Sequence, residues 1–110
     1  MNFNDYQKQA MKTALLSNDT DASIIYRALG LSGESGEVAG IIKKIIRDHN
    51  SDFSKIDKEN LIKELGDVLW YIATISDFFN ISLEEIAQTN ITKLKDRQRR
   101  NVLGGSGDNR

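Results

Sequence analysis

Four acidic residues occur as two pairs with helical spacing, and apolar residues flank both pairs. The pairs are Glu34 with Glu37 and Glu64 with Asp67. Residues three apart are neighbours on a helix surface, so each pair presents two carboxylates together. Ionised carboxylates beside an apolar seam are costly unless a cation or a hydrogen-bond donor satisfies them. The pattern predicts a site for a hard metal ion; the alternative is that the acids are simply solvated.

The available donors indicate which metal such a site would hold. Carboxylate oxygens favour Mg²⁺, with Mn²⁺ as an alternative, and these ions take further ligands from water and substrate phosphates. The chain has no cysteine and a single histidine, His49, which excludes Cys-ligated zinc and histidine-rich sites. It also lacks the paired Glu-x-x-His motifs of di-iron bundles. Magnesium and phosphate chemistry fits best.

The elements that must position these acids are predicted to be helices. The chain has no proline, and its apolar residues recur with a period near 3.6. The expected helices run from Asn4 or Asp5 to Leu16, from Ala22 or Ser23 to Arg47, from between Ser54 and Asp57 to Phe79, and from Ser82 to about Arg99. Asn80 is expected to end the third helix, and Ser82 and Glu85 form a capping box for the fourth. If the second and third helices pack antiparallel, all four acids converge.

Glycines are unusually frequent around the acids. They are Gly30, Gly33, Gly36 and Gly40 in the second helix and Gly66 in the third. Each costs about 1 kcal/mol in a helix interior relative to alanine. We expect close helix approach to be the reason, and the alternative is a helix broken between Gly30 and Gly33.

Positively charged residues, opposite in sign to the acidic pairs, lie near the C-terminus. Asn90, Lys93 and Arg97 fall within the apolar stripe of the fourth helix, where such donors would grip a polyphosphate and neutralise charge on a leaving group. Arg99 and Arg100 are expected to be a solvated basic helix end, which suits the helix dipole. Residues 104–110 are expected to form a flexible glycine-rich tail after a domain of residues 1–103.

Composition restricts the class of protein. The chain has 110 residues, 39% apolar and 28% charged, with a formal net charge of −1, as expected of one globular domain. It shows neither a membrane span nor an N-terminal targeting segment, so a cytoplasmic protein is expected. Its charge does not call for nucleic acid or a membrane as a partner. A non-enzymatic helical module that binds nucleotides or nucleic acid through the basic C-terminal end is the alternative, and it predicts salt-sensitive binding without a metal.

Four stretches together resemble one known family. They read GLSGESGEVA from Gly30, KK from Lys43, ELGDVLWY from Glu64 and NITKLKDR from Asn90. These stretches resemble the MazG-type nucleoside triphosphate pyrophosphohydrolases, part of the all-α NTP pyrophosphatase superfamily that includes dimeric dUTPases and phosphoribosyl-ATP pyrophosphohydrolase. The resemblance covers nearly the whole chain and is weakest at its start. Unlike the larger two-domain MazG proteins, this chain has one copy of the motif.

The resemblance implies an all-α, four-helix bundle-like fold that assembles into a homodimer or homotetramer. It implies Mg²⁺-dependent hydrolysis of a (deoxy)nucleoside triphosphate between the α and β phosphates, yielding the monophosphate and pyrophosphate. Mg²⁺ would activate a water and stabilise the leaving pyrophosphate. The alternatives within the superfamily are enzymes acting on dUTP, dCTP or phosphoribosyl-ATP. House-cleaning of damaged nucleotides is one compatible role.

The resemblance also implies roles for individual residues. The metal ligands would be Glu34, Glu37, Glu64 and Asp67, with Glu37 also the candidate general base. Phosphate or sugar contacts would come from Asn90, Lys93 and Arg97, and base contacts from Phe3, Tyr6 and Gln7. The C-terminal tail would fold over bound nucleotide. Trp70 lies opposite the apolar stripe of the third helix, so it is expected to be exposed at a subunit interface.

Overall fold

The chain folds entirely into helices. The computed structural model describes residues 1–110 and contains no strand. Its elements are α1 (Phe3–Met11), α2 (Asp21–Asp48), the short 3₁₀ helix η1 (Phe53–Lys55), α3 (Lys58–Phe78) and α4 (Leu83–Arg99). The predicted all-α class is therefore confirmed. None of the helices combines the length and hydrophobicity that crossing a membrane requires.

Local capping residues explain where several helices begin and end. The hydroxyl of Ser82 accepts a hydrogen bond from the Glu85 backbone N–H at 3.1 Å, which confirms the predicted N-cap of α4. The return bond from the Ser82 N–H to the Glu85 side chain, the other half of the predicted capping box, is not formed. Asn80 has a φ of 55°, the left-handed conformation that ends many helices. The backbone N–H of the next residue, Ile81, donates to the Ser76 carbonyl at 2.9 Å. This closes α3 in a Schellman motif, as expected for an asparagine at this position.

The first helix is shorter than predicted, because it ends at Met11 rather than Leu16. The guanidinium of Arg27 is almost fully buried and takes its acceptors from the following loop. It donates to the Leu16 carbonyl at 2.9 Å and to the Asn18 side chain at 2.7 Å. A buried charge must be satisfied by hydrogen bonds. The segment after α1 therefore turns around Arg27 instead of continuing as a helix.

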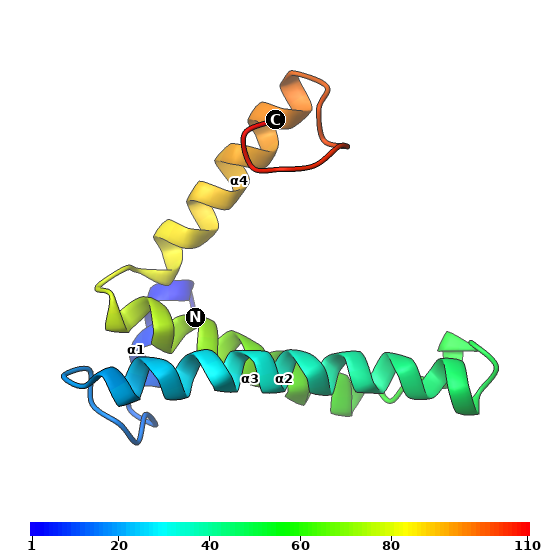
Figure 1. Cartoon of the computed structure of the whole chain (residues 1–110), viewed down its shortest axis with the longest axis horizontal. Helices are drawn as coiled ribbons and strands as arrows, with labels where there is room; N and C mark the ends of the chain where they lie inside the picture. The colour runs from blue at the N-terminus through cyan, green and yellow to red at the C-terminus, as the bar shows by residue number, and fades with distance from the viewer.

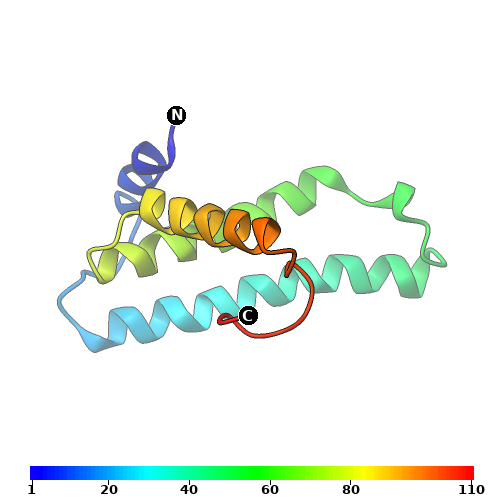
Figure 2. The same cartoon turned by 90° about the horizontal axis from the view of Figure 1, so that it is seen from above.

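Helices α2 and α3 lie side by side and antiparallel over most of their length, as Figures 1 and 2 both show. α1 packs on α3, whereas α4 contacts α1 and α3 and then projects away from the α2–α3 pair. A small core of Ala10, Ala73 and Leu83 lies where these elements meet. The four helices of one chain thus form an open arrangement rather than a closed bundle.

The glycines of α2 do not interrupt it, so the alternative of a broken helix is wrong. A methyl group at Gly30 would overlap the ring of Tyr71 on α3, which confirms close helix approach at this position. The other helical glycines, Gly33, Gly36, Gly40 and Gly66, have open space where a side chain would start. Close helix packing within the chain therefore explains the need for glycine at position 30, but not at the other four helical positions.

Trp70 does not have the exposed position that the helical pattern predicted. Its ring is half-buried and packs against the small core, and its Nε1–H donates to the Thr13 hydroxyl at 2.8 Å. The segment after α1 covers this side of α3. The apolar pattern of α3 alone predicted that this side would be exposed to solvent. Trp70 therefore gives no support to a subunit interface.

Gln7 joins three parts of the chain. Its side-chain nitrogen donates to the carbonyls of Ala73, at 3.2 Å, and Ile81, at 3.0 Å. Its oxygen accepts the backbone N–H of Leu83 at 3.0 Å. The residue is buried, so these bonds replace those that water would otherwise make. Gln7 thereby fixes α1 to the end of α3 and the start of α4.

Replacing this amide should destabilise the protein. Gln7→Ala leaves buried backbone groups without partners, at about 1–3 kcal/mol for each unsatisfied group. We expect the free energy of unfolding to fall by about 2–4 kcal/mol in urea titrations at fixed protein concentration. Lys8→Ala, a change at the exposed neighbouring position, is the control and should have little effect. Equal stability of the two variants would contradict this role for Gln7.

Candidate functional site

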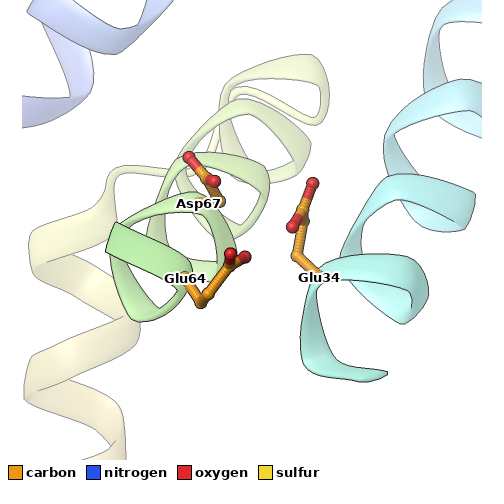
Figure 3. Close-up of side chains that lie close together, drawn as sticks. All are labelled: Glu34, Glu64 and Asp67. Atoms are coloured by element: carbon orange, nitrogen blue, oxygen red, sulfur yellow. The ribbon is translucent and has the colours of Figure 1, made fainter. Parts of the chain in front are cut away.

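The antiparallel pairing of α2 and α3 brings three acidic side chains together. Glu34 projects from α2 towards Glu64 and Asp67 on α3, as Figure 3 shows. Each contributes a carboxylate oxygen, and these oxygens all lie within 4.8 Å of one another. Glu34 and Glu64 are half-buried, and Asp67 is exposed. Three of the four predicted ligands are thus within reach of a single ion.

The electrostatics of this acidic cluster are unfavourable without a cation. Burial raises the pKa of Glu34, and the charges of Asp67 and Glu64 and a hydrogen bond with Glu64 raise it further. No lysine or arginine forms an ion pair with any of the three acids. Hard carboxylate oxygens without a protein counter-charge suit a hard divalent cation. The residues present therefore fit the magnesium ion that the sequence predicts.

Glu37 lies outside the acidic cluster. It is exposed and is not among the residues whose oxygens converge. Its charge is nevertheless the last contributor to the raised pKa of Glu34, so it is near the cluster. The geometry leaves Glu37 free to contact a water or a substrate beside the three convergent carboxylates.

Two tyrosines near the cluster were not predicted. The pKa of Tyr71 is raised by burial, then by a hydrogen bond and charge interaction with Tyr26, and then by the charges of Glu34 and Asp67. Tyr71 follows Asp67 by four residues, which places both on one helix face. That spacing was the available signal, but an aromatic residue at such a position is usually core. Tyr71 instead borders the acids and lies against Gly30.

An apolar pocket lies between the start of α1 and the helices α3 and α4. It has a volume of about 340 Å³ and is lined by Met1, Asn2, Phe3, Tyr6, Leu69 and Glu84. Burial raises the pKa of Tyr6, and the charge of Asp67 raises it further, so one lining residue of the pocket lies within the electrostatic reach of the acidic cluster. Two of the predicted base contacts, Phe3 and Tyr6, line it. Gln7 does not, because its amide is committed to backbone groups.

The predicted phosphate contacts lie on α4. Asn90 and Lys93 line a second pocket of about 350 Å³. Lys93 and Arg97 both form ion pairs with Asp108 of the C-terminal tail, which folds back against α4 rather than extending from it (Figure 1). Since α4 projects away from the α2–α3 pair (Figure 1), this basic group and the acidic cluster belong to separate parts of one chain.

Comparisons with known proteins agree with the family resemblance of the sequence. The family model for the MazG nucleotide pyrophosphohydrolase domain matches residues 25–102, a region containing all three clustered acids and the basic residues of α4. The Gene 37 protein of Mycobacterium phage L5 is 39% identical over 114 aligned positions that cover the whole of both chains. The uncharacterized protein YvdC of Bacillus subtilis (strain 168) is 35% identical over 72 positions, covering 61% of this chain and 68% of YvdC.

No solved structure matches the chain. The names of these two relatives specify neither a reaction nor a substrate. The family match spans most of the chain and confirms the resemblance carried by the two acidic motifs and the α4 motif. This chain belongs to the MazG nucleotide pyrophosphohydrolase family.

Proposed function

We propose that this protein is a Mg²⁺-dependent nucleoside triphosphate pyrophosphohydrolase. It would cleave a (deoxy)nucleoside triphosphate between the α and β phosphates, releasing the monophosphate and pyrophosphate. The observation that carries the proposal is the convergence of Glu34, Glu64 and Asp67 within a MazG domain, with no protein cation to neutralise them. A nucleotide is the substrate class that the family implies. The cytoplasm, where triphosphates are abundant, is the proposed location.

The acidic cluster is the proposed metal site. Glu34, Glu64 and Asp67 would hold the ion, with Mn²⁺ as a substitute for Mg²⁺ and Glu37 as a further candidate ligand. When bound, the ion would supply positive charge for the phosphates and lower the pKa of water. Glu37, exposed beside the cluster, would accept a proton from the attacking water as a general base.

The remaining predicted residues would bind the other parts of the nucleotide. Phe3 and Tyr6 would stack on the base, since they line an apolar pocket, Tyr6 senses the charge of Asp67, and aromatic side chains of this kind suit nucleobases. Lys93 and Arg97 would bind the phosphates and stabilise charge on the departing pyrophosphate. Asn90 would contact phosphate or sugar from the second pocket. Gln7 is left out of this set because its amide is already engaged.

A second copy of the chain would complete the site. The radius of gyration is 16.9 Å, against about 13 Å for a compact domain of this length. Large apolar residues are exposed on three helices, among them Ile25 and Leu29 on α2, Ile62 and Leu65 on α3, and Ile91 and Leu94 on α4. Packing a partner against these surfaces would bury them and close the open arrangement. We therefore propose a homodimer or homotetramer in which α4 of one subunit approaches the acids of another.

Divalent cations should stabilise the protein through the acidic cluster. We expect millimolar Mg²⁺ or Mn²⁺ to raise the melting temperature, because ligands that bind only the folded state stabilise it. Glu64→Gln should weaken this effect and, without metal, should raise the melting temperature by removing like-charge repulsion. If Glu37 is also a ligand, Glu37→Gln should likewise weaken the rise in melting temperature that the divalent cation causes. No metal effect on the unmodified protein would contradict the proposed site.

Substitution of the clustered acids should abolish catalysis without unfolding the chain. We expect Glu34→Gln and Asp67→Asn to lower kcat for a triphosphate roughly a hundredfold or more, the scale of a lost electrostatic contact to the transition state. Glu59→Gln, at an exposed acid of α3 paired with Lys63, is the matched control and should keep full activity. The proposal fails if both cluster variants fold normally and keep full Mg²⁺-dependent pyrophosphate release.

The shared site can be tested by complementation. Asp67→Asn and Lys93→Ala should each be inactive alone, whereas co-expressed subunits should recover up to about a quarter of normal activity in a dimer, because half of randomly formed dimers contain one intact site. Light scattering should show a dimer or tetramer at micromolar concentrations. A monomer, or no recovery in mixed oligomers, would contradict the shared site.

A further inference from the structure

The basic residues of α4 already bind a carboxylate from the same chain. One side-chain oxygen of Asp108 lies 3.2 Å from Lys93 Nζ and 3.2 Å from Arg97 Nη2. The same Nη2 donates to the backbone carbonyls of Asp108, at 2.9 Å, and Gly107, at 3.4 Å. Two cations that converge on one oxygen make an anion site. The structure therefore contains an anion site, and Asp108 of the tail occupies it.

The tail also controls access to Arg97. The Arg97 side chain is 6% exposed, whereas the Asp108 side chain that contacts it is 82% exposed. The tail residues therefore lie on the solvent side of Arg97, and the hydrogen bonds of Arg97 point into them. A phosphate that takes the same hydrogen bonds from this guanidinium must displace the tail. Hydrogen bonds from Lys93 and Arg97 also hold the pKa of Asp108 below its usual range, as expected of a carboxylate that is bound ionised.

Backbone geometry and a terminal arginine hold the tail in this position. Gly105 and Gly107 have φ values of +96° and +83°, which residues with a side chain rarely adopt. Arg110 donates to the carbonyls of Val102, at 3.2 Å, and Leu103, at 3.1 Å, and also to that of Gly107. The tail is thus a folded loop that presents Asp108. None of its residues is buried, which is typical of segments that open readily.

We propose that residues 104–110 are a built-in competitor of the substrate, in which the Asp108 carboxylate occupies the Lys93–Arg97 anion site until a polyphosphate displaces it. The inference rests on the proposed function, because it takes these two residues to be the phosphate contacts. A triphosphate carries several negative charges and a carboxylate carries one, so a nucleotide can exchange with Asp108. Competition of this kind raises the concentration of substrate required and leaves the rate at saturation unchanged.

Asp108→Asn in the full-length protein tests the competition. Inorganic pyrophosphate is the probe, with its dissociation constant measured by isothermal titration calorimetry. We expect it to bind roughly two- to fivefold more tightly to the variant, the range for losing an exposed ion-pair partner as the competitor. KM for a triphosphate should fall by a similar factor with kcat unchanged. Asp96→Asn is the matched control: it removes one negative charge from α4, but the partners of Asp96 are Arg99 and Arg100.

Gly107→Ala provides a second variant that changes no charge. Nothing lies within 4 Å of the added methyl group, but the φ of +83° becomes strained, which disfavours the folded tail. Pyrophosphate should again bind more tightly. Unchanged or weaker binding in Asp108→Asn, or an equal gain in Asp96→Asn, would overturn the inference.

The same experiments separate this inference from the hydrolase proposal. If the unmodified protein hydrolyses triphosphates but pyrophosphate affinity is the same in Asp108→Asn, the tail does not compete with substrate and the enzyme assignment stands. If no triphosphate is hydrolysed and pyrophosphate still binds more tightly to Asp108→Asn and Gly107→Ala, the anion site and its competitor stand and the hydrolase proposal fails.

Discussion

The close antiparallel contact between α2 and α3 is the constraint on which the rest of the structure depends. At Gly30 the two helices are close enough that a side chain would collide with Tyr71, and one turn further along α2 this packing places Glu34 opposite Glu64 and Asp67. The result is a cluster of like charges in which burial, and then the charges of Asp67 and Glu64, raise the pKa of Glu34. The fold therefore holds three repelling carboxylates together, which is costly for a protein without a cation and useful for one that binds it.

The other elements hold the ends of this helix pair and leave much of its surface uncovered. Gln7 and Arg27 are buried polar residues whose hydrogen bonds fix α1, the following loop and the start of α4 to α3. Only 10 of the 110 residues are buried, a small core for a chain with 39% apolar residues. The open shape, the exposed apolar side chains and the separation of acidic from basic groups are the observations behind the proposed homo-oligomer, which would account for all three.

Helical spacing and local capping predicted the parts of the structure that depend on neighbours in sequence. The all-helical class, the long α2, the Asn80 terminus and the Ser82 cap follow from such signals, and so does the approach of Glu34 to Glu64 and Asp67. The predictions were wrong where contacts between residues distant in sequence determine the structure. Arg27 ends α1 early by taking acceptors from the loop, and the segment around Thr13 covers Trp70. The Asp108 contact was also missed, because it requires two glycines at positive φ, which a polar, glycine-rich tail does not reveal.

The most direct test of the central claim is to identify the products formed by the unmodified protein. ³¹P NMR of a nucleoside triphosphate incubated with the protein and Mg²⁺ distinguishes cleavage at the α–β linkage from cleavage at the β–γ linkage. The three convergent carboxylates and the family membership predict monophosphate and pyrophosphate in equal amounts, with the reaction stopped by EDTA. Diphosphate and orthophosphate, or hydrolysis that continues unchanged in EDTA, would contradict the proposed function.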